Sequence, residues 1–122
     1  MQKILIVEDD VDLVETYTDL LEANHYLVTS AARANEAISL VTHLRPNVVL
    51  LDLNLAGYSG TIVINMIRHY KPLKDTKIVV ITGHPEMLNR SREVSRVDLV
   101  LSKPVSNDQL LETIKRIAPT AK

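Results

Sequence analysis

At 122 residues the chain has the length of a single domain, and we expect residues 1–122 to form one unit. Fourteen Lys and Arg residues nearly balance fifteen Asp and Glu residues, so the net charge of -1 gives no electrostatic footprint for direct nucleic acid binding. The sequence has no cysteine, which excludes disulfides and thiolate sites. It also has no signal peptide pattern and no apolar run near the roughly 18 residues of a membrane span, which favours a cytoplasmic protein with no membrane partner.

In the first half of the chain, apolar runs alternate with helical periodicity. The apolar runs are rich in Ile, Val and Leu and do not alternate with polar residues, which is typical of strands buried on both faces. The predicted elements are a strand at 4–7, a helix at 12–23, a strand at 26–29, a helix at 37–44 and a strand at 48–51. Asp12 and Glu15 have capping-box spacing at the start of the first helix. We interpret Asp10 as a solvent-facing or helix-capping residue.

The second half of the chain continues the same alternation. The predicted elements are a helix from 62 to near 70, which Pro72 ends, a strand at 78–81, a helix at 85–95, a strand at 99–101 and a helix at 107–117. The stretch 85–95 has few apolar residues, and we predict a helix there because a parallel crossover needs a connection. Strand and helix therefore alternate five times with short links, which predicts an α/β protein with a parallel sheet and helices on both faces.

Reactive side chains follow four of the five predicted strands. Glu8 and Asp9 end the first strand, Asp52 the third, Thr82 the fourth and Lys103 the fifth. Ligands bind beyond the carboxyl ends of the strands in open parallel sheets, so we expect these groups to meet at one edge. Three carboxylates repel one another and suit a hard cation such as Mg²⁺. A carboxylate beside Mg²⁺ can attack a phosphoryl group, and a lysine and a hydroxyl can stabilise the transferred group.

Four motifs carry a resemblance to a known family. KILIVEDD, LLDLNLAGYSG, VVITG and LSKP occur in this order, with thirty residues from Asp52 to Thr82 and twenty-one from Thr82 to Lys103. In order and spacing the chain resembles the receiver domain of two-component response regulators, of which the chemotaxis regulator is the single-domain type. The resemblance spans essentially the whole chain. It implies a doubly wound (βα)5 fold with a flavodoxin-like five-stranded parallel sheet in the order 2-1-3-4-5.

The resemblance implies a role for each matching residue in phosphoryl transfer. Asp52 matches the phosphoacceptor, and Thr82 matches the hydroxyl that closes on the phosphoryl group. Lys103 matches the lysine that grips a phosphoryl oxygen, and Pro104 matches the proline after it, whose peptide bond is often cis. The domain would thus catalyse its own phosphorylation and dephosphorylation without being a conventional turnover enzyme.

The resemblance also implies a metal site, which would hold Mg²⁺ or Mn²⁺. Glu8 and Asp9 match the acidic pair that holds the ion, with Asp9 as the direct ligand. Asp52 contributes a carboxylate oxygen, and Asn54 matches the residue whose backbone carbonyl binds the metal. The opening run of apolar residues would then end in acids because these form the cation pocket.

Two positions depart from the family pattern. Ala56 stands where the family often has proline, although Gly57 and Gly60 remain, and we assign both glycines to turn geometry. Val100 stands where the family commonly has Tyr or Phe, an aromatic residue that swings inward when the threonine moves. The aromatic part of that relay is therefore absent, and we expect a smaller activation change or one that is read on another surface.

The leading functional hypothesis is a phosphorylation-controlled signalling module. A histidine kinase or phosphotransfer protein would supply the phosphoryl group. The face formed by residues 85–95, 99–101 and 107–117 would then bind a downstream effector protein or effector domain, or a second copy in a homodimer. One alternative is a pseudo-receiver that binds partners without phosphorylation. A phosphatase of the haloacid dehalogenase type is disfavoured, because Asn54 stands where that class needs a second acidic residue.

Overall fold

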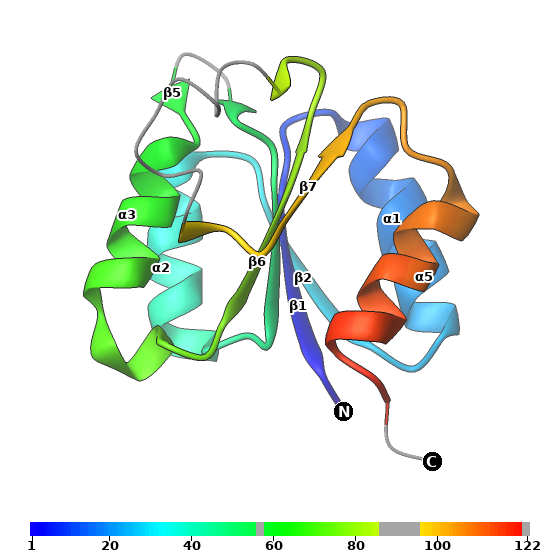
Figure 1. The fold of residues 1–122 in the computed structure, drawn as a ribbon, viewed down its shortest axis with the longest axis horizontal. Helices are drawn as coiled ribbons and strands as arrows, with labels where there is room; N and C mark the ends of the chain where they lie inside the picture. The colour runs from blue at the N-terminus through cyan, green and yellow to red at the C-terminus, as the bar shows by residue number, and fades with distance from the viewer. Residues whose placement is uncertain (56–57, 86–95, 121–122) are drawn as a thin grey trace.

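A computed structural model of the chain describes residues 1–55, 58–85 and 96–120 (Figure 1). One parallel sheet is built from five strands, namely β1 (Lys3–Val7), β2 (Leu27–Ala31), β3 (Val48–Leu51), β6 (Lys77–Thr82) and β7 (Leu99–Ser102). They lie in the order β2-β1-β3-β6-β7. Since β6 and β7 are the fourth and fifth strands of this sheet along the chain, the predicted order 2-1-3-4-5 is confirmed.

Among the described residues, two helices cover each face of the sheet. Figure 1 shows α1 (Val11–Ala23) and α5 (Asn107–Ile117) on one side, and α2 (Ala34–Leu44) and α3 (Thr61–His69) on the other. The predicted helix at 85–95 falls almost entirely on 86–95, outside the described residues. Three short elements were not predicted: β4 (Asn54–Leu55), β5 (Tyr58–Ser59) and the 3-10 helix η1 (Lys71–Leu73). No helix in the described part of the chain has the length and apolar character needed to span a membrane.

The sheet divides the apolar interior into two cores, because successive strand residues point to opposite faces. Leu5 and Val7 of β1 pack into the core beneath α2 and α3. Ile4 and Ile6 pack into the core beneath α1 and α5. The same alternation runs through β3 and β6, whose residues are almost all buried. These central strands are therefore buried on both faces, as the sequence predicts.

The two edge strands depart from that prediction. Residues of β7 alternate between partly buried and exposed, and only one residue of β2 is fully buried. An edge strand has a neighbour on one side only, and helices cover it less completely. The second strand also begins and ends later than predicted, at Leu27–Ala31, and Tyr26 lies between the turn after α1 and the first residue of the strand.

The predicted capping box at the start of the first helix is wrong. Asp10 is the N-cap of α1, and its Oδ1 accepts hydrogen bonds from the backbone N–H groups of Asp12 (3.0 Å) and Leu13 (3.2 Å). Asp10 therefore takes the capping position, and Asp12 lies inside the first turn of the helix. The negative charge of Asp12 there still interacts favourably with the helix dipole. The interpretation of Asp10 as a capping residue is confirmed.

Tyr26 fastens the C-terminal end of the chain to the core. Its ring is almost fully buried, and its hydroxyl donates a 2.8 Å hydrogen bond to the carbonyl oxygen of Ala118. We expect Tyr26→Phe to lower the free energy of unfolding by about 1 kcal/mol, because it leaves that carbonyl without its donor. Urea unfolding of the variant measures this loss. Tyr70→Phe is the control, because the Tyr70 side chain is exposed; an equal loss there would contradict the assignment.

Tyr26 also makes the free energy of unfolding depend on pH in the alkaline range. Burial raises the pKa of the Tyr26 hydroxyl above its usual value near 10. The unfolded chain therefore loses this proton at a lower pH than the folded protein does. The contribution of Tyr26 is complete below about pH 10 and is lost as the pH rises through the folded pKa. The unfolding free energy of Tyr26→Phe should fall less steeply in that range.

Candidate functional site

Backbone hydrogen bonds at the carboxyl ends of the strands hold the site residues in register. Asp52 follows β3, and its N–H donates to the carbonyl oxygen of Val7 in β1 (3.0 Å). Lys103 follows β7, and its N–H donates to the carbonyl oxygen of Thr82 in β6 (2.8 Å). Glu8 follows β1 and donates in the same way to the last carbonyl of β2 (3.0 Å). The backbone of each of these three residues is therefore held in place by a hydrogen bond to a neighbouring strand.

Three carboxylates meet at this edge, as the sequence predicts. Oxygen atoms of Glu8, Asp9 and Asp52 lie within 4.8 Å of one another. Opposite ligands of one Mg²⁺ are about 4.2 Å apart when each metal–oxygen distance is about 2.1 Å. Small side-chain adjustments would thus bring the cluster around a single ion. The donor set consists of hard oxygens with an excess of negative charge, and these residues therefore fit a divalent cation of the Mg²⁺ type.

Lys103 compensates two of these carboxylates. Its Nζ donates to Oε1 of Glu8 (2.8 Å) and to Oδ2 of Asp52 (3.3 Å). Glu8 and Asp52 are only 4% and 7% exposed, so their charges have little contact with water. Burial alone would lower the pKa of Lys103, but the hydrogen bond to Glu8 and the charge of Asp52 outweigh burial and raise it. The ammonium therefore stays charged at neutral pH.

Glu8 and Asp9 occupy different environments. Both oxygens of Glu8 are engaged, Oε1 by Lys103 and Oε2 by the backbone N–H groups of Asp9 (3.1 Å) and Asp10 (3.2 Å). Burial raises the pKa of the Glu8 carboxyl, and the hydrogen bond from Lys103 opposes this change only in part. Asp9 is exposed, and no hydrogen bond to its carboxylate is found within residues 1–55, 58–85 and 96–120. Of the two, Asp9 presents the more accessible ligand oxygens.

Thr82 ends β6, the strand beside β3, and Asn54 contacts the carboxylate of Asp52. Thr82 is 1% exposed, and its Oγ1 accepts a hydrogen bond from the backbone N–H of His84 (3.0 Å), which leaves the hydroxyl hydrogen able to donate. The backbone N–H of Asn54 donates to Oδ1 of Asp52 (3.1 Å) and orients that carboxylate. The peptide bond between Lys103 and Pro104 is cis, as the resemblance implies.

The sequence predicts that Gly60 is needed for turn geometry, but the structure gives a steric reason instead. Its φ of -65° is open to any residue, so backbone freedom is not the reason for glycine. A Cβ atom at Gly60 would lie 2.6 Å from the carbonyl oxygen of Asp52 and 2.9 Å from Cα of Leu53. Glycine is needed because α3 begins directly against the backbone of Asp52. Ala56 and Gly57 lie outside the described residues.

The comparison with protein families identifies the chain. The family model of the response regulator receiver domain matches residues 4–115. The chain belongs to this family. It is a receiver domain of two-component systems, and its family is one of signalling domains rather than conventional turnover enzymes. Both the acidic edge and the strand order described above are consistent with this membership.

Curated relatives match almost the whole chain. The sporulation initiation phosphotransferase F of Bacillus subtilis is 26% identical over 121 residues, which cover 97% of this chain and 94% of the relative. The phosphate regulon transcriptional regulatory protein PhoB of Escherichia coli is 30% identical over 125 residues. That match covers 98% of this chain but only 55% of PhoB, so the chain spans about half the length of this relative.

Solved structures agree with the fold. The chemotaxis protein CheY4 of Vibrio cholerae superposes with a TM-score of 0.86 at 26% identity, covering 96% of this chain and 98% of that chain. The response regulator protein TrrA of Thermotoga maritima, solved in complex with Mg²⁺ and a beryllium fluoride, gives a TM-score of 0.84 at 27% identity. This match covers 96% of this chain and 99% of that chain. The chain thus has the receiver fold over nearly its whole length.

Proposed function

We propose that this receiver domain is phosphorylated on Asp52 in a reaction that depends on Mg²⁺ or Mn²⁺. The single observation that carries the proposal is the placement of a buried carboxylate, that of Asp52, between the Lys103 ammonium and two further acids. The donor would be a histidine kinase or a phosphotransfer protein, in keeping with the family. The related TrrA was solved in complex with Mg²⁺ and a beryllium fluoride, which supports a metal-dependent reaction for this domain.

Asp9, Asp52 and the backbone carbonyl of Asn54 would hold the metal directly. Glu8 would act mainly through its negative charge and through bound water, because Lys103 and two backbone N–H groups already occupy its oxygens. When bound, the ion would neutralise the acids and the oxygens of the transferred group. The accessibility of each carboxylate would thus decide which oxygens contact the metal.

In the proposed reaction, a carboxylate oxygen of Asp52 attacks the phosphorus of the donor. A new O–P bond forms while the bond from phosphorus to the donor nitrogen breaks, and the electron pair of that bond leaves with the donor. The Lys103 ammonium and the Thr82 hydroxyl donate hydrogen bonds to phosphoryl oxygens as charge develops on them. In dephosphorylation, a water oxygen attacks the phosphorus of the aspartyl phosphate, the bond from phosphorus to the Asp52 oxygen breaks, and inorganic phosphate leaves. The domain would thus catalyse both the phosphorylation and the dephosphorylation of Asp52.

The proposed output is a shift in the surface that includes β7 and α5. Lys103 links this region to the site, since it directly follows β7 and contacts both buried acids. Val100, exposed on β7, replaces the usual aromatic residue, so Thr82 and Lys103 would carry the signal without a swinging ring. The surface would bind an effector protein or domain, or a second copy of the chain. We propose that residues 1–122 act as one receiver unit, and that it works in the cytoplasm.

Intact mass after incubation with acetyl phosphate and Mg²⁺ tests the proposal. We expect a gain of one phosphoryl group, no gain when Mg²⁺ is chelated and none in Asp52→Asn. Asp19→Asn is the matched control, because this exposed aspartate of α1 lies outside the carboxylate cluster and should leave the gain intact. Mass is the appropriate readout because the chain has no tryptophan for a quenching assay.

Two results would overturn the phosphorylation proposal. A phosphoryl gain that persists in Asp52→Asn would move the acceptor to another residue. No gain, together with an NMR spectrum that does not respond to beryllofluoride and Mg²⁺, would make the chain a pseudo-receiver that binds partners without phosphorylation.

A further inference from the structure

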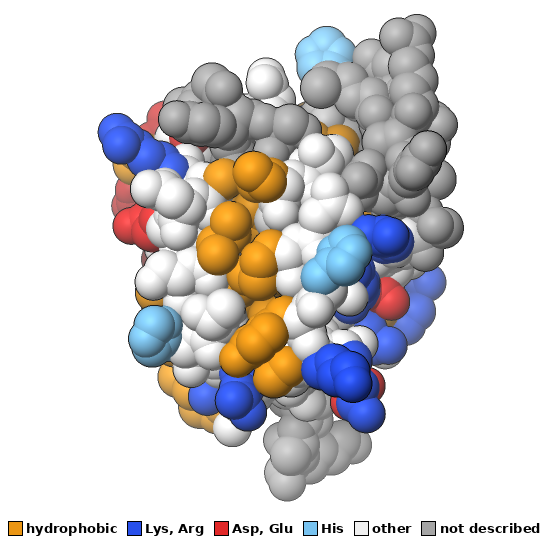
Figure 2. Space-filling model, turned by 90° about the vertical axis from the view of Figure 1, so that its left-hand side faces the viewer, with side chains coloured by type: hydrophobic (Ala, Val, Ile, Leu, Met, Phe, Trp, Pro, Cys, Tyr) orange, Lys and Arg blue, Asp and Glu red, His pale blue; other side chains and the backbone are white. Residues whose placement is uncertain are grey.

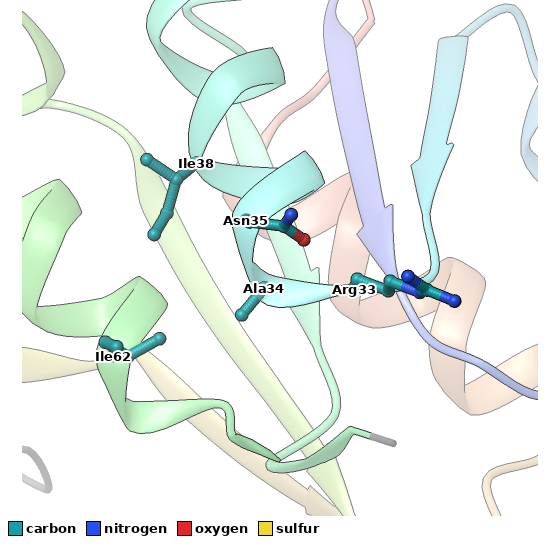
Figure 3. A pocket seen from close by; sticks show the side chains of 5 residues that line it. All are labelled: Arg33, Ala34, Asn35, Ile38 and Ile62. Atoms are coloured by element: carbon teal, nitrogen blue, oxygen red, sulfur yellow. The ribbon is translucent and has the colours of Figure 1, made fainter. Parts of the chain in front are cut away.

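A shallow groove lies between α2 and α3, on the face opposite α1 and α5 (Figure 3). It is lined by Arg33, Ala34, Asn35 and Ile38 from the start of α2, and by Ile62 from the start of α3. We define these five residues as the α2–α3 groove. Ile62 is 52% exposed although it is a large apolar residue, and Figure 3 shows Ile38 and Ile62 facing each other across the space. This apolar floor has no part in the proposed phosphorylation chemistry.

The size of the groove favours side chains of a partner over a small-molecule ligand. Its volume is about 230 Å³. Small-molecule sites typically measure roughly 300–1,000 Å³ and enclose most of the ligand. A space of this size accepts one or two aliphatic side chains that project from a larger partner. Because α2 and α3 lie side by side, the space between them suits a third helix, whose apolar residues would follow a spacing of three to four.

The charge around the groove indicates an acidic partner. Residues 33–45 and 61–74 carry five Lys or Arg residues but a single acid, Glu36, in a chain whose net charge is -1. The five are Arg33, Arg45, Arg68, Lys71 and Lys74. Figure 2 shows this face, with an apolar stripe along it and Lys and Arg side chains toward both ends of the stripe. In contrast, α1 on the opposite face carries four acids and no Lys or Arg.

Arg33 and Arg45 are available for intermolecular contacts, whereas Arg68 is not. Arg68 is engaged, because its guanidinium donates to Asp98 and to the backbone carbonyls of Thr76 and Arg96. Arg33 lines the groove and Arg45 ends α2, and both are exposed. Neither forms an ion pair within the part of the chain that the structure describes. An apolar floor with Arg33 at its rim and Arg45 at the opposite end of α2 is complementary to an acidic amphipathic helix that runs along α2.

We propose that the α2–α3 groove docks an acidic amphipathic helix of a partner protein. Aliphatic side chains of that helix would pack on Ile38 and Ile62, and its Asp or Glu residues would pair with Arg33 and Arg45. The docking face is distinct from the surface of β7 and α5 that the proposed phosphorylation would switch. It would therefore give the domain a second contact, one that holds a partner independently of the state of Asp52.

A synthetic peptide tests the proposal without a known partner. The probe is a helical peptide of about 15 residues, with leucines at i, i+4, i+7 and i+11 and glutamates at flanking positions. We expect its addition to shift amide signals of α2 and α3 in the NMR spectrum of the intact chain, without Mg²⁺ or a phosphoryl donor. The same peptide with every glutamate replaced by glutamine should bind more weakly. High salt should weaken binding of the acidic peptide, because the exposed charges are then screened.

Substitutions in the groove separate the apolar and the charged contributions. Ile62→Ala should weaken binding about five- to tenfold, because it removes the central exposed apolar contact. The pair Arg33→Gln and Arg45→Gln should weaken it about threefold. Matched controls are Val11→Ala, an exposed apolar residue of α1, and the pair Lys115→Gln and Arg116→Gln on α5, all of which should leave binding unchanged. Urea unfolding and acetyl phosphate labelling of each variant report that the fold is intact.

Several outcomes would overturn the docking proposal. The acidic peptide could fail to bind, or its addition could shift only amide signals outside α2 and α3. The glutamine peptide could also bind as tightly as the acidic one. Binding to vesicles that contain phosphatidylglycerol, lost in Arg33→Gln with Arg45→Gln while the peptide does not bind, would assign the face to an anionic lipid surface. Concentration-dependent self-association that Ile62→Ala abolishes, again without peptide binding, would make a second copy of the chain the occupant.

Discussion

Replacing Lys103 with methionine is expected to lower the free energy of unfolding of the chelator-treated protein by about 3 kcal/mol at neutral pH. The ammonium contacts both Glu8 and Asp52, which are buried and close to a third acid. Removing one partner of a buried ion pair leaves an uncompensated charge and costs about 3–5 kcal/mol, and the lower value applies because Lys103 is itself 25% exposed. Urea unfolding in EDTA measures the change.

The same variant has a characteristic pH dependence. Burial already raises the pKa of Glu8, and loss of the hydrogen bond from Lys103 removes the main opposing effect. When the pKa of a carboxyl is higher in the folded than in the unfolded protein, the protonated form favours folding. This contribution to stability is complete below the unfolded pKa and is lost as the pH rises through the folded pKa. The destabilisation of Lys103→Met should therefore shrink as the pH falls toward about 4.5. Mg²⁺ should restore part of the stability at neutral pH by supplying positive charge.

Lys77→Met is the matched control for this experiment. The Lys77 ammonium lies 4.0 Å from Asp98 with its side chain about half exposed, so its loss should cost less than about 1 kcal/mol. Equal destabilisation of the two variants, or an effect of Lys103→Met that grows toward acid pH, would contradict the compensating role of Lys103. Loss of acetyl phosphate labelling in Lys103→Met with normal labelling in Lys77→Met would further support the proposed role in phosphoryl transfer.

Gly60→Ala is expected to reduce the labelling of Asp52 at least about tenfold and to destabilise the fold by about 2 kcal/mol. The new Cβ would overlap backbone atoms of Asp52 and Leu53, which cannot rotate away as a side chain tip can. The start of α3 or the Asp52 backbone must then move, and a displacement of about 1 Å can cost a hundredfold in rate. Time-resolved intact mass with acetyl phosphate and Mg²⁺ measures the labelling rate.

Gly83→Ala provides a control within the same edge of the sheet. Gly83 directly follows Thr82, but a Cβ there would meet no atom within 4 Å. Its stability should therefore be unchanged or slightly higher, because alanine loses less backbone entropy on folding. Wild-type labelling in Gly60→Ala would show that the Asp52 backbone accommodates the methyl group, and the steric role of Gly60 would then be wrong.

The sheet and the position of the acids were predictable because both follow from short-range patterns. Continuous apolar runs identify central strands, and in a parallel sheet all carboxyl ends reach one edge. Glu8, Asp52 and Lys103 could thus be brought together from their places in the chain alone. The motifs then added the strand order and the role of each residue through resemblance to a family that the comparison confirms.

Features that depend on exact distances were not predictable. Asp10 rather than Asp12 caps α1, because a shift of two residues decides which carboxylate reaches the free N–H groups. The requirement for Gly60 arises from contact with Asp52, which no local pattern reveals. Partial exposure of β7 follows from its place at the sheet edge, which its apolar composition conceals. Simultaneous contact of Lys103 with two acids likewise depends on atomic positions.

The sheet separates the apolar interior into two cores, with the backbone of the strands between them. The core under α2 and α3 and the core under α1 and α5 share no side chain among the described residues. Substitutions on opposite sides therefore have few common partners, and their stability effects should be nearly additive. One side can then acquire a new binding surface while the packing of the other is preserved. A signal that passes from one core to the other through packed side chains would cross the strands, at whose common edge the acids lie.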